Sequence, residues 1–237
     1  MGKVYLIGAG PGDPDLLTVR ATEILKNVNC VLYDDLVSKD IIAIIPKKIK
    51  KIKVGKIKGE DTDKQQEKIN NLMVKLSKEG KSVARLKSGD PFLFGRGGEE
   101  MLILKKEHIN YEIVPGITSA IGVPTSIGLP VTHRDYSSSL MILPGHMKVK
   151  NRLNWRNIAE FDGTIVFLMG AENLEIIVSN LLNAGMVPTL PVCLISNGTT
   201  RKEKILKGLL SDIVYKAKKQ KMQSPLIIVI GKVVDIL

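Results

Sequence analysis

Residues 4–35 read V-Y-L-I-G-A-G-P-G-D-P-D-L-L-T-V-R-A-T-E-I-L-K-N-V-N-C-V-L-Y-D-D, and this stretch decides the fold. A short apolar run ends in a glycine-rich turn, apolar residues then recur at helical spacing as far as Val28, and a second apolar run ends at Asp34 and Asp35. This order predicts strand, loop, helix and strand, with Pro14 suited to the first turn of the helix. A β-α-β unit requires parallel strands, and the loops that follow parallel strands gather along one edge of the sheet.

The same alternation continues along the chain and predicts a doubly wound α/β layer in the N-terminal half. Its expected elements are a helix near Ile41, a Lys-rich strand within 47–58, a helix over 62–78, a strand at 83–86, a helix after Gly97 and a strand at 111–114. Glycines and prolines between 115 and 130 predict an irregular connector, so we expect two domains, 1–116 and 117–237. In the second we expect strands at 140–143, 164–168, 192–196 and 226–230, and helices around 174–182 and 209–218.

Composition narrows the class of protein. Of 237 residues, 44% are hydrophobic but only 4% are aromatic, which predicts an aliphatic core and few side chains on which nucleic-acid bases stack. The net charge of +11 favours an anionic partner, which leaves nucleic acid, a membrane surface and a polyanionic small molecule open. Cys30 and Cys193 are far apart beside apolar residues, which predicts two buried thiols in a reducing compartment. The chain shows no signal-peptide core and no apolar run of about 20 residues, so we expect a cytoplasmic protein that does not enter a membrane.

Two glycine clusters follow predicted strands. In G-A-G-P-G-D at 8–13, Asp13 stands where a dinucleotide-binding loop has its third glycine, and its carboxylate would repel a pyrophosphate. E-G-K-S at 79–82 lacks the leading glycine of a P-loop. The second cluster, R-L-K-S-G-D-P-F-L-F-G-R-G-G-E-E at 85–100, belongs to the same sheet edge as the first. Two glycine-rich loops at one edge predict a ligand pocket.

Two further strings carry polar groups. In V-P-G-I-T-S-A at 114–120, Thr118 and Ser119 either cap a helix or face a ligand. G-L-P-V-T-H-R-D at 128–135 concentrates charge and hydrogen-bond donors at His133 and Arg134, in a segment that is otherwise apolar, which favours contact with a ligand or a partner. The histidines lack H-E-x-x-H spacing and there is no C-x-x-C, so we expect no metal site.

These strings, with L-M-G-A at 168–171 and S-N-G-T-T at 196–200, resemble the tetrapyrrole methylase family over essentially the whole chain. G-A-G-P-G-D is shared with other cobalamin-pathway methylases, diphthine synthase and an rRNA ribose methylase, whereas F-G-R-G-G-E-E and T-H-R-D are far more specific to members that act on uroporphyrinogen III. The resemblance implies the tetrapyrrole methylase fold, two α/β domains with the active site in the cleft between them, usually in a homodimer. It further implies an S-adenosylmethionine-dependent C-methyltransferase that methylates uroporphyrinogen III at C2 and C7, giving precorrin-2 via precorrin-1. Because this chain begins directly with the methylase motif, we expect it to lack the dehydrogenase and ferrochelatase portion of some relatives.

The resemblance also implies roles for single residues. The cofactor is expected at Pro11, Ser88, Gly89, Asp90, Leu93, Thr118, Ser119, Met169 and Gly198. Asp34 is the implied proton acceptor and Lys56 the implied proton donor. Two positions depart from the family pattern: Ser88 stands where glycine is usual, and Asp35 where arginine is common.

A substrate with many carboxylates accounts for the basic charge better than nucleic acid does. Arg96, His133 and Arg134, with Lys56, are the candidate carboxylate ligands, since guanidinium groups bind carboxylates bidentately. Three alternatives stay open: a sister methylase that acts on a later cobalamin precursor, an rRNA ribose or the diphthamide side chain; a basic RNA-binding module without catalysis; and, more distantly, a dehydrogenase.

Overall fold

The computed structural model describes residues 1–55, 61–146 and 153–237, and the chain divides into two compact units, Met1–Thr118 and Ser119–Leu237. The division falls two residues beyond the boundary predicted after residue 116. Each unit has its own sheet, and each is described by itself.

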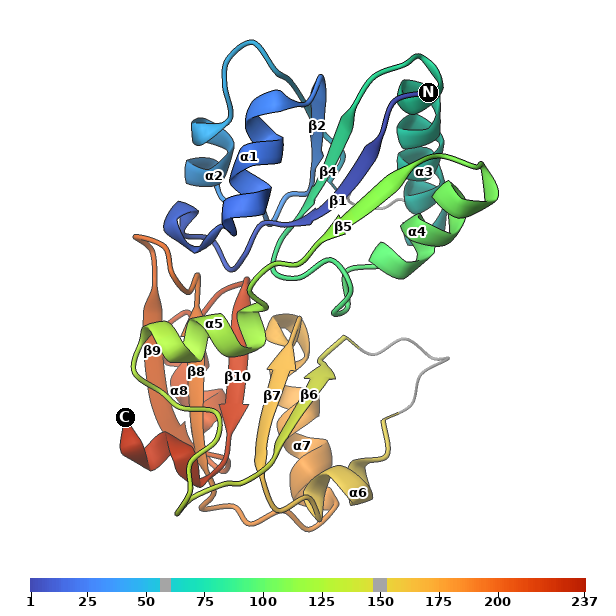
Figure 1. Cartoon of the computed structure of the whole chain (residues 1–237). Helices are drawn as coiled ribbons and strands as arrows, with labels where there is room; N and C mark the ends of the chain where they lie inside the picture. Colours follow the sequence, from blue (N-terminus) through green and yellow to red (C-terminus); the bar gives the residue numbers. More distant parts are fainter. Residues whose placement is uncertain (56–60, 147–152) are drawn as a thin grey trace. The chain divides into compact units, whose positions relative to one another are not determined.

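The first unit is a parallel sheet with helices on both faces (Figure 1). Its strands are β1 (Val4–Gly8), β2 (Cys30–Tyr33), β3 (Lys50–Lys53), β4 (Val83–Lys87) and β5 (Tyr111–Val114), in the order β3-β2-β4-β1-β5. Its helical elements are the 3-10 turn η1 (Pro14–Leu16), α1 (Val19–Asn27), α2 (Lys39–Ile44), α3 (Thr62–Lys78) and α4 (Gly97–Lys106). The predicted doubly wound layer is confirmed.

Alternate residues of these strands face opposite helical layers. Ile7 and Val31 pack with α1 and α2, whereas Leu6 and Leu32 pack with α3 and α4. Both sets are buried, because helices cover both faces of the sheet. This arrangement leaves the strand ends, and the loops that follow them, as the places where polar groups reach the surface.

The first helix begins later than its sequence pattern suggests. Asp13 caps the 3-10 turn that starts at Pro14, and its Oδ1 accepts a hydrogen bond from the backbone N–H of Asp15 at 2.9 Å. The α-helix then begins at Val19, where Thr18 Oγ1 accepts from the N–H of Ala21 at 3.1 Å. Two successive caps therefore separate the first glycine loop from α1.

An ion pair fixes the edge strand β5 to the start of the chain and to α1. Glu112 accepts hydrogen bonds from Arg20 at 2.8 and 3.0 Å and from Lys3 at 2.6 Å. These bonds, first from Arg20 and then from Lys3, lower the pKa of Glu112 to about 2. The folded unit is thus most stable when this carboxyl group is ionised.

The second unit is built on a mixed sheet of order β6-β7-β10-β8-β9. Its elements are α5 (Ser119–Ser126), β6 (Leu140–Pro144), α6 (Trp155–Ala159), β7 (Thr164–Leu168), η2 (Ala171–Asn173), α7 (Leu174–Asn183), β8 (Pro191–Ser196), β9 (Lys204–Leu209), α8 (Ile213–Lys219), β10 (Leu226–Ile230) and η3 (Lys232–Ile236). Among the strands described here, β6 and β7 alone pair in parallel; β10 is antiparallel to both of its neighbours, so β6, β7 and β8 run in the same direction. Their carboxyl ends therefore lie at one edge of this sheet.

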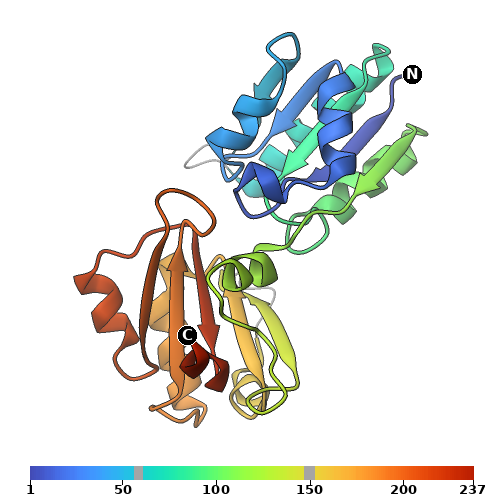
Figure 2. The ribbon, with the colours of Figure 1, turned by 60° about the vertical axis from the view of Figure 1, so that its left-hand side comes forward.

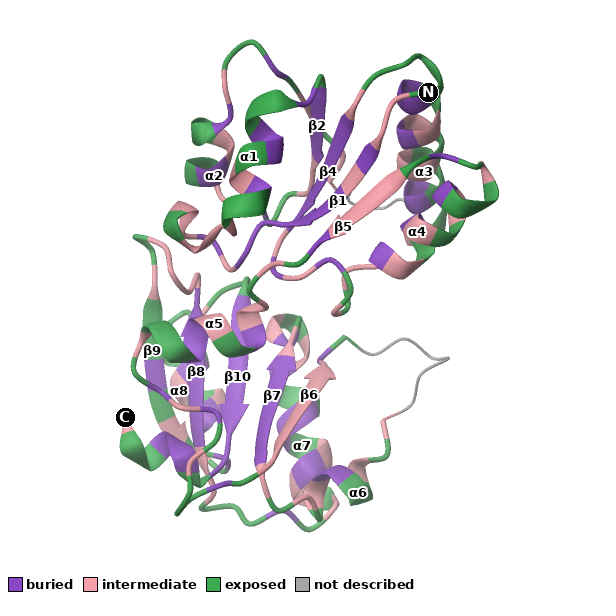
Figure 3. Ribbon diagram, in the orientation of Figure 1, coloured by how far each residue is buried: buried purple, intermediate pink, exposed green. Residues whose placement is uncertain are grey.

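Helices α6, α7 and α8 cover one face of the second sheet, and α5 packs on the other face (Figures 1 and 2). The central strands β7, β8 and β10 are buried almost throughout, as the colours of Figure 3 show. Cys193 on β8 is fully buried, and this burial raises the pKa of its thiol to about 11. Cys30 is also buried and free, which confirms the two buried thiols.

The region 204–219 differs from its prediction. The expected helix over 209–218 begins only at Ile213, because K-I-L-K-G-L at 204–209 forms the edge strand β9. Leu206 of this strand is buried whereas Ile205 is exposed, as the pleat of a half-covered strand requires. In the described parts of the chain, no helix is long and apolar enough to cross a bilayer.

Candidate functional site

Three loops of the first unit meet at their glycines, after β1, β4 and β5. A Cβ atom built on Gly8 would lie 2.5 Å from the nitrogen of Gly116 and 2.6 Å from the carbonyl oxygen of Gly89. A Cβ on Gly116 would lie 2.6 Å from Cα of Gly8. Because these neighbours are backbone atoms, no larger residue fits without moving a loop.

The first and second glycine loops are also joined by hydrogen bonds. The N–H of Gly89 donates to the carbonyl of Gly10 at 2.8 Å, and the N–H of Gly10 donates back to Gly89 at 3.2 Å. Both residues have φ near +70°, at +73° and +68°, which glycine adopts without cost. The two glycine-rich loops predicted to share a sheet edge therefore lie in direct contact.

The carboxylate of Asp90 accepts two backbone hydrogen bonds within these loops. Its Oδ1 accepts from the N–H of Phe92 at 2.8 Å and its Oδ2 from the N–H of Gly116 at 3.2 Å. Asp90 thus fixes the loop after β4 to the loop after β5. The other predicted cofactor contacts of this unit, Pro11, Ser88, Leu93 and Thr118, are half-buried in the same three loops.

Asp34 follows β2, the neighbour of β4, and joins a group of buried charges. Nη2 of Arg85 lies 2.6 Å from Oδ1 of Asp34, and Nε of Arg85 lies 3.0 Å from Oε1 of Glu100. Nζ of Lys87 lies 2.9 Å from the same oxygen of Glu100. Arg85, Lys87 and Glu100 are at most 3% exposed, whereas the side chain of Asp34 is 29% exposed. We call these four residues the buried charge cluster; it presents one carboxylate, that of Asp34, to the surface.

The environment of the buried charge cluster shifts its ionisations. Burial, followed by the charge of Arg85, lowers the pKa of Lys87. Burial opposes the ionisation of Glu100, but the charges of Arg85 and Lys87 outweigh it and lower the pKa of this carboxyl group. Arg85, Lys87 and Glu100 were not among the residues predicted for the site. The available signal was two cations on one face of V-A-R-L-K at 83–87, a strand otherwise apolar.

Glycines in the loops of the second unit are also closely packed, against backbone at Gly145 and against a side chain at Gly198. After β6 and β7, a Cβ on Gly145 would lie 2.9 Å from the nitrogen of Gly170. After β8, a Cβ on Gly198 would lie 2.8 Å from Cγ2 of Val123 and would collide with its Cγ1. Met169, in the loop after β7, is 40% exposed and has φ +58°.

Backbone strain gathers in the same loops. Seven described residues other than glycine have positive φ. Five of them lie in the loops after β4, β7 and β8: Phe94, Arg96, Met169, Asn197 and Thr199. Left-handed backbone at residues with side chains costs about 1–3 kcal/mol each and concentrates at functional sites. Backbone strain and close glycine packing therefore occur at the strand ends where ligand contacts were predicted from the sequence.

The candidate carboxylate ligands differ in how they are engaged. Arg96 is paired with Glu99 at 2.6 Å and Asp63 at 3.0 Å. Nδ1 of His133 accepts from the backbone N–H of Asp135 at 3.1 Å. Arg134 is exposed and pairs with no described residue, so its guanidinium is open to a ligand. Lys56 lies outside the described residues.

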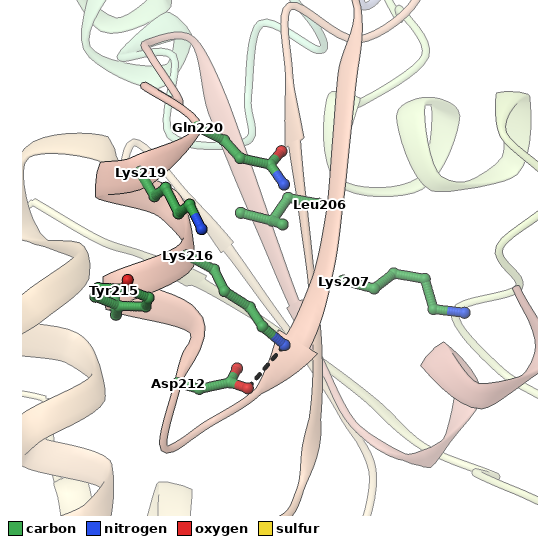
Figure 4. Close-up of a pocket in the computed structure, with 7 residues that line it drawn as sticks. All are labelled: Leu206, Lys207, Asp212, Tyr215, Lys216, Lys219 and Gln220. Atoms are coloured by element: carbon green, nitrogen blue, oxygen red, sulfur yellow. Dashed lines mark ion pairs between the residues drawn. The ribbon is translucent and has the colours of Figure 1, made fainter.

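A hollow of about 630 Å³ lies elsewhere, between β9 and α8 (Figure 4). It is lined by Leu206, Lys207, Asp212, Tyr215, Lys216, Lys219 and Gln220. None of these residues was predicted for the site, and Lys216 is neutralised by Asp212 at 2.7 Å. Across residues 1–55, 61–146 and 153–237, no three His, Cys, Asp or Glu side chains are grouped as a metal site requires.

The chain has a parallel α/β unit with glycine loops at its strand ends, followed by a unit with a mixed sheet. This architecture places it among the α/β enzymes that bind ligands at strand ends. The model of the Tetrapyrrole (Corrin/Porphyrin) Methylases matches residues 3–214, and the chain belongs to this family. The resemblance and the fold class are therefore confirmed.

Three relatives lie close to this chain. It is 48% identical to the uroporphyrinogen-III C-methyltransferase of Methanocaldococcus jannaschii, over 100% of this chain and 98% of the relative. It is 44% identical to the S-adenosyl-L-methionine-dependent uroporphyrinogen III methyltransferase of Methanosarcina barkeri, over 99% and 93% of the two chains. The crystal structure of the uroporphyrin-III C-methyl transferase of Thermus thermophilus, complexed with S-adenyl homocysteine, superposes with a TM-score of 0.86 at 36% identity and covers 100% of both chains.

Proposed function

We propose that this chain is an S-adenosylmethionine-dependent methyltransferase that methylates uroporphyrinogen III at C2 and C7, giving precorrin-2 via precorrin-1. The proposal rests on what lies at the carboxyl-terminal edge of the sheet in the first unit. There Asp34 and the three glycine-bearing loops stand at the carboxyl ends of neighbouring strands. The two relatives named as uroporphyrinogen III methyltransferases match the chain along almost their whole length.

The loops suit a bent, sulfonium-bearing cofactor. S-adenosylmethionine supplies the methyl group when it is bound. The loop glycines allow a ligand to approach the backbone closely, and Asp90 holds the loops in register. We propose that Pro11, Ser88, Gly89, Asp90, Leu93 and Thr118 of the first unit, with Ser119, Met169 and Gly198 of the second, hold this cofactor. Their task is to align donor and acceptor and to exclude water, since methyl transfer is an in-line displacement.

Asp34 is the proposed proton acceptor. A pyrrole carbon that gains a methyl group becomes part of a cationic ring until a proton leaves it, so a nearby carboxylate stabilises the cation and takes the proton. Arg85 occupies Oδ1 of Asp34, and no described residue hydrogen-bonds to Oδ2. The second oxygen is thus open to the proton of the substrate. Lys56 is the proposed proton donor.

The substrate carboxylates need cationic ligands. We propose Arg134 and His133 for this role, because Arg134 is exposed and the imidazole is part-exposed beside it. Arg96 is proposed as a third ligand, which would exchange Glu99 or Asp63 for a carboxylate of the substrate. We further propose that the enzyme is cytoplasmic and a homodimer; light scattering tests the dimer, and a mass near twice 26.0 kDa would support it.

The test compares two neighbouring carboxylates. Asp34→Asn should lower the turnover of uroporphyrinogen III by about 10²-fold or more, the usual contribution of a positioned general base, and leave the affinity for S-adenosylhomocysteine unchanged. Asp35→Asn is the matched control, because the carboxylate of Asp35 binds Lys53 at 2.6 Å instead. Full turnover by Asp34→Asn would remove the assigned role.

The choice of substrate is tested separately with the parent chain. Labelled methyl groups should reach uroporphyrinogen III in preference to a later cobalamin precursor, rRNA or the diphthamide acceptor. Faster transfer to any of these three would assign the chain to a sister activity. RNA affinity that falls steeply with salt, without cofactor uptake, would favour the RNA-binding alternative.

A further inference from the structure

Glu100 is the centre of the buried charge cluster. One of its oxygens, Oε1, accepts from Nε of Arg85 at 3.0 Å, from Nζ of Lys87 at 2.9 Å and from Nε2 of Gln66 at 3.0 Å. The other oxygen, Oε2, is buried and has no hydrogen-bond partner in the described structure. The whole side chain is inaccessible to solvent.

This arrangement is a poor way to stabilise a fold. Buried ion pairs lose the hydration of both charges, and apolar residues of similar volume often stabilise a fold equally well or better. Leaving a carboxylate oxygen buried without a partner adds a further cost. A benefit other than stability is therefore expected, and the geometry of Arg85 indicates what it is.

Arg85 connects Glu100 to Asp34. Its Nε binds Glu100, its Nη2 binds Oδ1 of Asp34 at 2.6 Å, and its Nη1 donates to the carbonyl of Leu86 at 3.3 Å. Because the guanidinium group is planar and rigid, fixing Nε determines where Nη2 points. The position of Glu100 thus determines where Asp34 is held.

Lys87 and Gln66 hold Glu100 in turn. Lys87 comes from the end of β4 and Gln66 from α3, so the carboxylate is fixed from two elements besides its own helix α4. Gln66 also donates to Asn70 at 3.1 Å, which orients its amide. The side chains of Gln66 and Glu100 are therefore both held in place by hydrogen bonds below the surface at which Asp34 lies.

We infer that Glu100 is a positioning residue of the reaction, which acts through Arg85 to hold Asp34 with one oxygen bound and the other directed to the substrate. The inference rests on the proposed role of Asp34. Glu100 is the second glutamate of F-G-R-G-G-E-E, and this role could not be predicted from the motif or from its exposed neighbour Glu99.

The test is Glu100→Gln, which keeps the shape of the side chain but removes its charge and turns one acceptor into an N–H₂ group. Misplacement of a reacting group by about 1 Å costs roughly 10²-fold, so kcat should fall by about that factor while KM and the affinity for S-adenosylhomocysteine change little. Glu107→Gln is the matched control, since Glu107 follows the end of the same helix and, among the described residues, its side chain pairs only with the exposed Lys78 at 2.7 Å. It should keep the parent turnover.

A double variant separates positioning from general damage. If Glu100 acts through Asp34, Glu100→Gln should slow the Asp34→Asn enzyme by less than about twofold, since the two losses would not add. Additive losses, or full turnover by Glu100→Gln alone, would overturn the inference. Full turnover by Asp34→Asn alone would instead overturn the role proposed for Asp34, and failure of the parent chain to methylate uroporphyrinogen III would overturn the proposed function.

A second variant applies if Glu100→Gln does not fold. Gln66→Leu leaves every charge of the cluster in place and removes one donor to Oε1. Loss of one hydrogen bond predicts a fall in kcat of about fivefold. Parent turnover by Gln66→Leu would then refute the inference.

Discussion

Replacement of Gly116 by alanine tests the contact among the three loops. The added methyl carbon would lie 2.6 Å from Cα of Gly8 and 2.7 Å from its carbonyl carbon. Carbon atoms pack at about 3.5–4.0 Å, so the loops must separate by about 1 Å. The N–H of Gly116 also donates to Asp90, and a shift of this size lengthens a bond that is already 3.2 Å.

Two effects are expected from this displacement. Overpacking should lower the free energy of unfolding by about 1–3 kcal/mol, with the unfolding temperature falling by roughly 2–4 °C for each kcal/mol. Turnover should fall by about 10²-fold, since a shift of 1 Å near the reacting groups has this cost. Calorimetric titration with S-adenosylhomocysteine and labelled methyl transfer measure the binding and the rate.

Gly98→Ala is the matched control. A Cβ on Gly98 meets no atom within 4 Å, and alanine is favoured over glycine inside a helix by up to about 1 kcal/mol. This variant should be as active as the parent and slightly more stable. If Gly116→Ala bound S-adenosylhomocysteine and turned over as well as Gly98→Ala does, the close contact of the loops would be irrelevant to the site.

Three further predictions concern the two units separately. Glu112→Gln should make stability less sensitive to acid: the folded pKa of Glu112 is about 2 against an ordinary 4.5, so the parent loses this stabilisation as pH falls from about 4.5 towards 2, and the amide has none to lose. Thermal melts from pH 6 to pH 2 measure the difference, and parallel curves would contradict it. The thiol of Cys193, with its pKa raised to about 11, should react with a thiol reagent only after unfolding, and rapid labelling of the native chain would be inconsistent with its burial. Gly198→Ala should destabilise the second unit by about 1–3 kcal/mol through collision with Val123, and Val123→Ala should restore part of the loss; no recovery of the unfolding temperature would exclude this contact as the cause.

Four strands of the first unit, β1, β2, β4 and β5, could be predicted from sequence to within one residue, whereas β3 (Lys50–Lys53) was located only within the longer range 47–58. Strands covered on both faces are continuous apolar runs, and the glycines and Asp34 that follow them mark their ends. The same reasoning found the glycine loops and their common edge. Strand β9 was missed because it is an edge strand with Lys204 and Lys207 in it, and its pattern resembles a polar helix as much as a strand.

The contacts of charged side chains could not be predicted. Arg96 was predicted as a ligand for substrate carboxylates, but its pairing with Glu99 and Asp63 was not foreseen, and Asp63 comes from another helix. Glu100, in the helix predicted after Gly97, was given no role, because its partner Arg85 lies fifteen positions away on a strand. Sequence spacing shows which residues share a strand end, whereas pairing across elements depends on how the helices pack against the sheet.

Strand β9 also bears on how the protein avoids aggregation. It borders its sheet, so one side of its backbone has no partner strand among the described elements, and its Ile205 and Leu209 are 42% and 37% exposed. An apolar border of this kind is a template for cross-β assembly. Lys204 and Lys207 place positive charges along it, and they would repel the identical strand of another copy. We expect that replacing both lysines with neutral residues would promote fibre formation at high protein concentration.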